Sequence, residues 1–150
     1  MVVWFEGTTE VECGLPAVMH SLEDLGEHSV GVVGLMPGLS DVELLEQGSD
    51  FVTIRTNEGR MERTNITTSL EGDRTAVEFD EKYQAGSRVT TTAHFAEDFT
   101  TNGTGVTYRV VVNDLAAPGF LGFLYRRFGS AKMGRAFLEA QKRHLEALSA

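Results

Sequence analysis

One acidic residue shares the apolar side of a predicted strand, which makes it the first candidate for chemistry in this chain. The segment 74–84 alternates, and Val77, Phe79 and Tyr83 fall on one side. Alternate residues of a strand point to the same face, so Glu81 belongs to that side as well. A partly desolvated carboxylate has a raised pKa unless a cation pairs with it, and it could act as an acid, a base or a ligand anchor. The alternative is a position at the rim, where Glu81 meets a basic neighbour.

Arg63 is a candidate partner for Glu81. One side of the segment 60–70 carries Met61, Arg63 and Asn65, and the other side is mainly polar. If the Met61 side points inward, Arg63 and Asn65 become buried polar groups that need hydrogen-bond partners, and Glu81 could pair with the arginine. The other interpretation is a surface ladder of threonines and charged residues.

A tyrosine on the last predicted strand is the third candidate. In the segment 105–114, alternation sends Tyr108 and Val110 inward. Tyr108 could present its hydroxyl to a ligand or complete the core. In the segment 87–100, the same rule places Phe95 inward and His94 on the solvent-facing side.

Motifs for metal, nucleotide or nucleophilic chemistry are missing from the sequence. The four histidines are scattered, and neither an HExxH motif nor a Cys/His cluster occurs. There is no GxSxG motif, no GxxxxGK[ST] loop and no GxGxxG loop. Cys13 is the only cysteine, so an internal disulfide is impossible. We therefore predict neither a metal nor a cofactor.

Composition narrows the classes of partner. The chain has 150 residues, a formal net charge of -9 and a pI near 4.8. An acidic surface repels nucleic acid and anionic lipid, so a phosphate-backbone binder is disfavoured. No apolar run approaches the ~20 residues that a membrane helix needs, and no basic then apolar leader follows Met1. We expect a cytoplasmic protein, either a monomer or a weak homodimer.

The elements that must position these side chains begin with one strand and two short helices. Residues 2–12 alternate as a strand, with Gly7 suggesting a bulge or bend. Pro16 opens a helix that runs through Leu25, and Gly26 is placed as its left-handed stop. A second short helix or irregular segment fills 27–39.

Six antiparallel strands are predicted next, because glycines punctuate the chain at the spacing of a meander. The strongest hairpin signal is Asn102-Gly103, and Glu71-Gly72-Asp73 and Asn57-Glu58-Gly59 are good ones. The predicted strands are 41–47, 50–57, 60–70, 74–84, 87–100 and 105–114.

A long amphipathic helix from Pro118 to Ala150 is predicted to cover this sheet. Its apolar stripe comprises Leu121, Leu124, Phe128, Ala131, Leu138, Leu145 and Leu148. Gly129 and Gly134 suggest a bend.

The predicted fold is α+β, a single domain over 1–150: a seven-stranded curved antiparallel sheet around a long C-terminal helix, with two short helices after strand 1. Long strands curl when twisted, so sheet and helix could enclose a space that side chains do not fill.

With these elements in place, the chain resembles the START-like superfamily, also called SRPBCC, and within it the polyketide cyclase/dehydrase-like proteins. The resemblance spans the whole chain, mostly as element order. Its residues are Leu15-Pro16-Ala17-Val18, the stretch from Gly38 to Gln47, Val77 to Tyr83, and Pro118-Gly119-Phe120-Leu121-Gly122. It implies a helix-grip fold around a hydrophobic pocket that binds lipids, polyketides or other apolar molecules. The glycine-rich loop of allergen-like members is not matched, since only Gln47-Gly48-Ser49-Asp50 stands there.

Three functions follow as hypotheses. The first is binding or transport of a small hydrophobic molecule. The second is a cyclase, aromatase or dehydratase that uses Glu81, Tyr108 and Arg63 in the same cavity. The third is a protein-interaction module that uses the outer sheet face or the region of Trp4. The expected ligand-binding residues are Phe79, Tyr83, Phe95, Tyr108, Val110, Leu121, Leu124 and Phe128.

Overall fold

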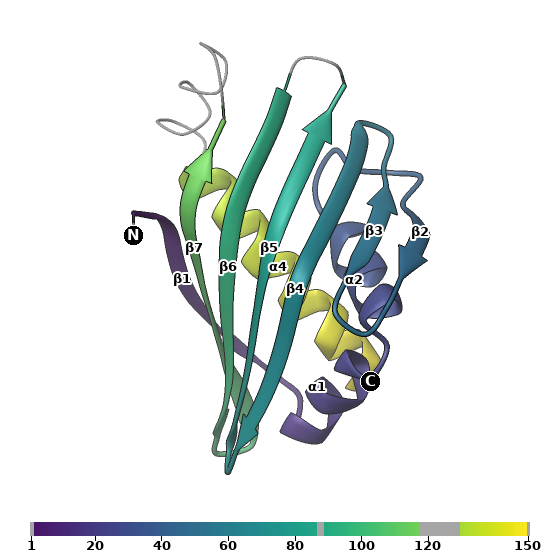
Figure 1. Cartoon of the computed structure of the whole chain (residues 1–150). Helices are drawn as coiled ribbons and strands as arrows, with labels where there is room; N and C mark the ends of the chain where they lie inside the picture. Colours follow the sequence, from purple (N-terminus) through teal and green to yellow (C-terminus); the bar gives the residue numbers. More distant parts are fainter. Residues whose placement is uncertain (1, 87–88, 118–129, 150) are drawn as a thin grey trace.

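The chain folds as a curved antiparallel sheet with helices on its concave side (Figure 1). The computed structural model describes residues 2–86, 89–117 and 130–149. The strands are β1 (Val3–Val11), β2 (Glu43–Gln47), β3 (Val52–Arg55), β4 (Gly59–Glu71), β5 (Arg74–Ala85), β6 (Val89–Asn102) and β7 (Gly105–Ala116). The helices are α1 (Leu15–Leu22), α2 (Leu25–Val33) and α4 (Ser130–Ser149). The predicted α+β fold class is confirmed: a seven-stranded curved antiparallel sheet packs around a long C-terminal helix, which is the helix-grip arrangement.

The seven strands form one sheet in the order β1-β7-β6-β5-β4-β3-β2. From β2 to β7, each strand pairs with the next along the chain, and β1 adds to the free edge of β7. Two of the tight turns depend on glycines in the left-handed region, Gly72 with φ 59° and Gly103 with φ 59°. This conformation is unfavourable for other residues, which explains why both turn signals are readable in the sequence.

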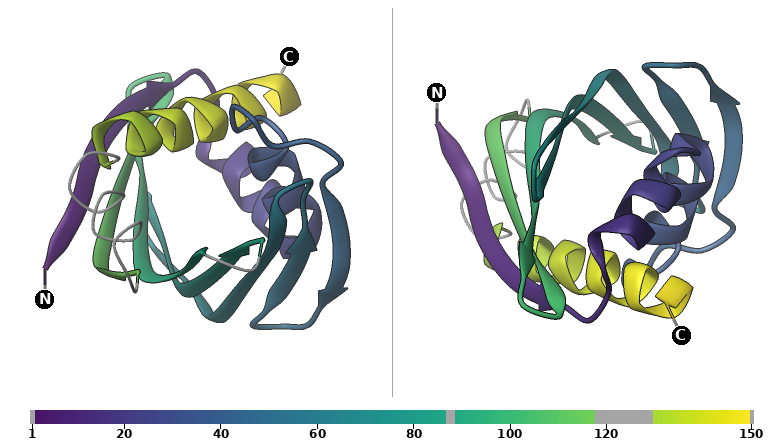
Figure 2. Two further views of the ribbon diagram at one scale, coloured as in Figure 1. Left: turned by 90° about the horizontal axis from the view of Figure 1, so that it is seen from above. Right: turned by 90° about the horizontal axis from the view of Figure 1, so that it is seen from below.

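The sheet curls, and the helices fill its hollow. Seen along the strands, it forms an open curve with α1, α2 and α4 inside (Figure 2). Helix α4 packs mainly along β1, whereas α2 lies beside β2 and β3 at the other end of the sheet. The helices therefore bridge the two edges of the curve, and the middle strands face them across the interior.

Two glycines let α4 approach β1 closely. A Cβ at Gly134 would lie 2.2 Å from the ring of Phe5, and a Cβ at Gly7 would lie 2.7 Å from Cδ1 of Leu138. The predicted bulge at Gly7 is wrong, because the register shift of β1 lies between Val3 and Phe5. Gly134 lies within α4, which is one helix in the described region. Both glycines supply packing space at this contact.

The predicted helix stop at Gly26 is also wrong. Helix α1 ends at Leu22, and Gly26 lies in the first turn of α2. The Asp24 side chain caps α2 by accepting a hydrogen bond from the Glu27 N–H at 3.1 Å. Gly26 is buried, and a Cβ there would lie 2.7 Å from Gln47 Oε1. The N-cap residue Asp24 therefore sets the start of α2. The missing side chain of Gly26 allows α2 to pack closely against β2.

A bulge in β4 resolves the ambiguous faces of that strand. The register between β4 and β5 shifts between Thr64 and Thr67, and Asn65 has φ 54°. Met61, Arg63 and then Ile66 are buried, whereas Asn65 is exposed and donates to Asp80 Oδ2 at 2.9 Å. The bulge lets one strand keep an apolar inner face although its sequence changes phase.

The helix stripe is partly as predicted. Leu138 and Leu145 are buried, but Leu148 is 52% exposed. Phe137 and Gln141 are buried instead, although the predicted stripe omits them. The residues Leu121, Leu124 and Phe128 lie outside the described residues. No described helix is both long enough and apolar enough to cross a membrane.

Candidate functional site

An interior cavity of about 100 Å³ lies between the sheet and the helices. Among the described residues, four polar ones contribute to its wall: Arg63, Glu81, Tyr83 and Thr91. The described apolar lining residues are Val33, Met36, Leu39, Met61, Ala93, Phe95, Val112, Leu115, Met133 and Phe137. A mainly apolar lining with a few converging polar groups is typical of a small-molecule site.

An ion pair contributes two charged side chains to this wall. Arg63 on β4 and Glu81 on β5 are cross-strand partners, and Arg63 Nε donates to Glu81 Oε1 at 3.3 Å. Their side chains are only 6% and 13% exposed. Arg63 Nη1 also donates to Ser29 Oγ on α2 at 3.3 Å, and the guanidinium carbon lies 4.7 Å from the ring centroid of Phe79. The sequence leaves two points open: whether Arg63 points inward, and whether Glu81 has a basic partner. The structure shows that Arg63 is buried and pairs with Glu81.

Glu97 is a buried acid that the sequence-based assignment missed. It accepts a hydrogen bond from the Tyr108 hydroxyl, and both groups are buried. Burial raises the pKa of Glu97, and the nearby Arg63 only partly opposes that effect. Burial and the adjacent Glu97 likewise raise the pKa of Tyr108. Glu97 is in phase with Phe95 and Phe99, so the alternation that assigned those two residues inward could have found it.

The predicted ligand-binding residues separate into three groups. Tyr83 and Phe95 line the cavity. Three others, Phe79, Tyr108 and Val110, are buried, but they are not among the described residues that line the cavity. Phe79 is the cross-strand partner of Phe95, and their rings stack with centroids 4.9 Å apart. The remaining three, Leu121, Leu124 and Phe128, lie outside the described residues.

Tyr83 contributes its ring to the cavity and its hydroxyl to the rim. The hydroxyl donates to Glu58 Oε1 at 2.7 Å and lies 3.4 Å from Thr56 Oγ1. Burial raises the pKa of Tyr83 to about 12, so the phenol stays protonated at neutral pH. It therefore anchors the turn before β4 and is not a general base.

Three methionines make the cavity deformable. Met36 follows α2, Met61 lies on β4 and Met133 lies in the first turn of α4, and all three line the cavity. Methionine side chains are unbranched and repack at low energetic cost, so a site rich in them can adapt to an occupant. Spacing along the sequence gives no signal for this grouping, because the three residues come from distant elements.

A second polar cluster joins α1, α2 and α4. Ser21 Oγ on α1 lies 2.7 Å from His28 Nδ1 on α2 and 3.1 Å from His144 Nε2 on α4. The side-chain nitrogen of Gln141 lies 3.2 Å from His28 Nε2. Burial, then the neighbouring His144 and Arg63, lower the pKa of His28 to about 3. The cluster is therefore neutral at pH 7, and it is a structural joint between helices.

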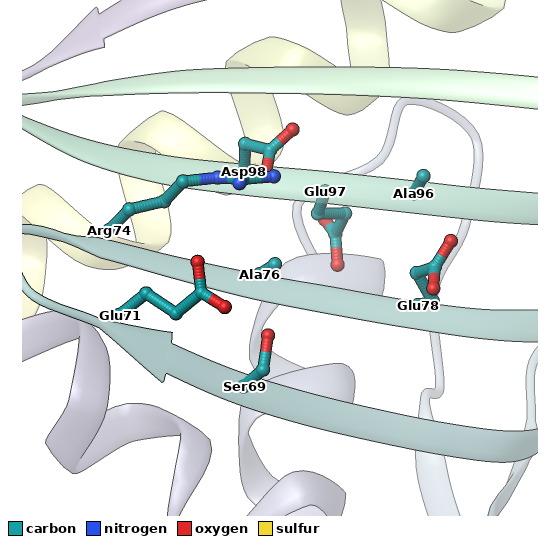
Figure 3. Close-up of a pocket in the computed structure, with 8 residues that line it drawn as sticks. All are labelled: Ser69, Glu71, Arg74, Ala76, Glu78, Ala96, Glu97 and Asp98. Atoms are coloured by element: carbon teal, nitrogen blue, oxygen red, sulfur yellow. The ribbon is translucent and has the colours of Figure 1, made fainter.

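The outer face of the sheet carries an open hollow of about 290 Å³ (Figure 3). Short side chains at Ser69, Ala76 and Ala96 form its floor, and Arg74 extends toward Asp98 at one end. Arg74 Nε donates to Asp98 Oδ1 at 2.8 Å, so its charge is already paired. The hollow is larger than the interior cavity but open and polar, which makes it the weaker candidate for an apolar ligand.

His94 lies on this outer face, as the alternation predicted. Its Nδ1 lies 2.9 Å from Asp80 Oδ1, and Asp80 raises the pKa of His94. The side chain is 36% exposed. Within the described residues, no group of three or more His, Cys, Asp or Glu side chains is arranged to hold a metal ion.

Comparisons with known proteins identify the fold. No protein-family model matches the chain, and no curated protein matches its sequence. Solved structures do match, at low identity. A STAR-related lipid transfer protein fragment from Xanthomonas axonopodis has 14% identity and a TM-score of 0.60, over 93% of this chain and 84% of that one. Protein Ms6760 from Mycobacterium smegmatis has 12% identity and a TM-score of 0.63, over 97% and 89%.

A third similar structure is the di-domain ARO/CYC StfQ from the steffimycin biosynthetic pathway. It is 14% identical with a TM-score of 0.55, and the match covers 99% of this chain and 51% of that protein. This chain therefore aligns with about half of the di-domain protein. At these identities the similarity shows a shared fold, the one found in the STAR-related lipid transfer protein and in StfQ.

Proposed function

We propose that residues 1–150 form one START-like domain that binds a small hydrophobic molecule in the cavity between the sheet and α4. The observation that carries this proposal is the lining: ten of the fourteen described residues that line the cavity are apolar, and Arg63 and Glu81 among the polar ones form an ion pair. The described fold is also that of a STAR-related lipid transfer protein and of an aromatase/cyclase. Binding rather than catalysis accounts for an apolar wall with few ionisable groups.

The size of the cavity defines what should be tested first. An engineered apolar cavity of about 150 Å³ in another protein binds benzene. A cavity of about 100 Å³ that is bordered by three methionines is therefore suited to a single-ring probe, and larger ligands require the methionines to move. We expect p-cresol to bind with measurable heat in a calorimetric titration.

Two matched substitutions locate the binding. Ala93 lines the cavity and Ala96 lines the outer hollow, and both lie on β6. Ala93→Leu should abolish p-cresol binding because the added carbons occupy the cavity, whereas Ala96→Leu should leave binding unchanged. Circular dichroism confirms that both variants fold. Equal binding by the Ala93→Leu variant, or no binding by the wild-type protein, would refute the proposed site.

Enzymatic use of the same cavity is the second candidate, because the Arg63 and Glu81 ion pair lies in the wall where it could polarise a carbonyl. Tyr108 fits this role less well, since its hydroxyl already donates to Glu97. A Glu81→Gln variant that still binds an aromatic polyketide-type substrate but no longer converts it would support catalysis. Unchanged conversion would remove Glu81 from it.

A further inference from the structure

The charge of Arg63 is balanced before any ligand arrives. Its Nε donates to Glu81 Oε1, its Nη1 donates to Ser29 Oγ, and its guanidinium group stacks over Phe79. A second carboxyl, Glu97, lies within electrostatic range of the same guanidinium group. An anionic ligand would thus meet an arginine whose strongest partner is already in place, with a carboxylate beside it.

Glu81 has unused capacity to accept hydrogen bonds. Among the described residues, only its Oε1 receives a donor, from Arg63, and no described donor reaches Oε2. The residue lines the cavity, and its cross-strand neighbours on the inner face are Arg63 and Ala93. A carboxylate accepts several hydrogen bonds, and Oε2 is not among the described buried atoms that lack a partner, so it can meet water or a ligand. A ligand that donates a hydrogen bond would satisfy it.

The surroundings of Glu81 also disfavour charged ligands of either sign. A ligand carboxylate would face Glu81 across a space of low dielectric constant, where repulsion between like charges is strong. A ligand ammonium group would lie beside the Arg63 guanidinium group and lose its hydration among methionine and phenylalanine side chains. Only an uncharged donor gains a hydrogen bond without either penalty.

We infer that the cavity selects uncharged molecules that donate one hydrogen bond to Glu81, such as a phenol or an alcohol, and rejects carboxylates. This inference rests on the proposed binding function, because it specifies the chemistry of the same cavity. Glu81 is then the residue that determines specificity, and Arg63 holds its carboxylate in place.

Three probes of similar shape test this selection: p-cresol, 4-methylanisole and p-toluate. The first donates a hydrogen bond, the second has the same ring without a donor, and the third is an anion. In calorimetric titrations of the wild-type protein at pH 7.5, we expect p-cresol to bind at least tenfold more tightly than either of the other two. Equal or tighter binding of 4-methylanisole or p-toluate overturns the inference while leaving the proposed function intact. If none of the three binds, the proposed function fails and the inference fails with it.

Substitution of the pair gives a second, independent readout. In Glu81→Gln, the repulsion is gone and Arg63 lacks its ionic partner, so p-toluate should bind at least tenfold more tightly than it does to the wild-type protein. The buried arginine could destabilise that variant. The double variant Arg63→Gln, Glu81→Gln carries no charge at the site and should bind p-cresol and p-toluate with affinities closer than in the wild-type protein. An unchanged affinity ratio in both variants contradicts the role of Glu81.

Discussion

At the scale of single residues, the interior of this protein is defined by two acids with different partners. Glu81 pairs with the Arg63 guanidinium group and lines the cavity. Glu97 is buried beside the Tyr108 hydroxyl, and burial raises its pKa. The same residue type thus forms an ion pair at one position, whereas at the other it is a buried carboxyl group whose pKa is raised by burial.

Replacing Glu97 by glutamine should change the pH dependence of stability. In the unfolded chain Glu97 loses its proton near pH 4.5, whereas the folded protein retains it to higher pH. Glu97 therefore contributes stability that is fully present below pH 4.5. This contribution is lost as the pH rises through the raised pKa of Glu97 in the folded protein. Glu97→Gln stays neutral, so its free energy of unfolding relative to that of the wild-type protein should increase between pH 4.5 and 7. Urea unfolding at several pH values measures this difference.

The control for this experiment is Glu139→Gln, because Glu139 is exposed on α4. It should show a constant difference from the wild-type protein over the same pH interval. A Glu97→Gln curve parallel to the wild-type curve would mean that Glu97 is ionised in the folded protein.

At the scale of elements, the polar joint among α1, α2 and α4 fixes the helices on the sheet. Ser21, His28, Gln141 and His144 make the contacts. A glycine supports this joint: a Cβ at Gly31 would lie 2.4 Å from the His144 ring. The position of α4 over the cavity is therefore linked to a cluster that must stay neutral.

Acid should weaken this joint. His28 binds a proton near pH 6.5 in the unfolded chain, but only near pH 3 in the folded protein. As the pH falls through this interval the unfolded chain is protonated first, so stability present above pH 6.5 is lost. At about 1.4 kcal/mol per pH unit, the full loss approaches about 5 kcal/mol. His94, whose pKa Asp80 raises, contributes in the opposite direction.

His28→Gln isolates this contribution. Chemical unfolding between pH 7 and pH 4 should give a flatter stability curve for this variant than for the wild-type protein. His20→Gln is the matched control, since the His20 side chain is 82% exposed, and it should reproduce the wild-type slope. Identical slopes for all three proteins would show that His28 is not a proton-sensitive part of the joint.

At the contact between α4 and β1, packing and helix propensity predict opposite changes in stability when a glycine is replaced by alanine. Alanine favours a helix by about 1 kcal/mol over glycine. Gly134→Ala should nevertheless destabilise the protein, because the new Cβ would lie 2.2 Å from the Phe5 ring. Thermal unfolding measures the change. In a Phe5→Leu background the penalty should shrink, and a penalty that persists there would place its cause elsewhere.

The sequence predicts the strands more completely than it predicts the residues of the candidate site. Alternation and turn glycines predicted every strand of the sheet, because both signals are local. The position of Arg63 was left open, since a bulge at Asn65 reverses the phase of β4. The joint of Ser21, His28 and His144 could not be predicted, because it combines three elements that only the packed helices bring together.

At the scale of the whole molecule, the curved sheet and the helices leave a small, methionine-rich cavity with one ion pair in its wall. The fold provides this space by bending the middle strands away from α4, which packs mainly on β1 at the edge of the sheet. Function then depends on whether the cavity, and not the open hollow on the outer face, receives a ligand.

The most direct test follows the methionine methyl groups by NMR during a titration with p-cresol. Met36, Met61 and Met133 line the cavity, whereas Met19 is an internal control whose sulfur accepts a hydrogen bond from Thr75 at 3.0 Å. We predict saturable shifts of the Met36, Met61 and Met133 signals and an unchanged Met19 signal. If these three signals stay fixed at saturating p-cresol, or if only Met19 responds, the cavity is not the binding site.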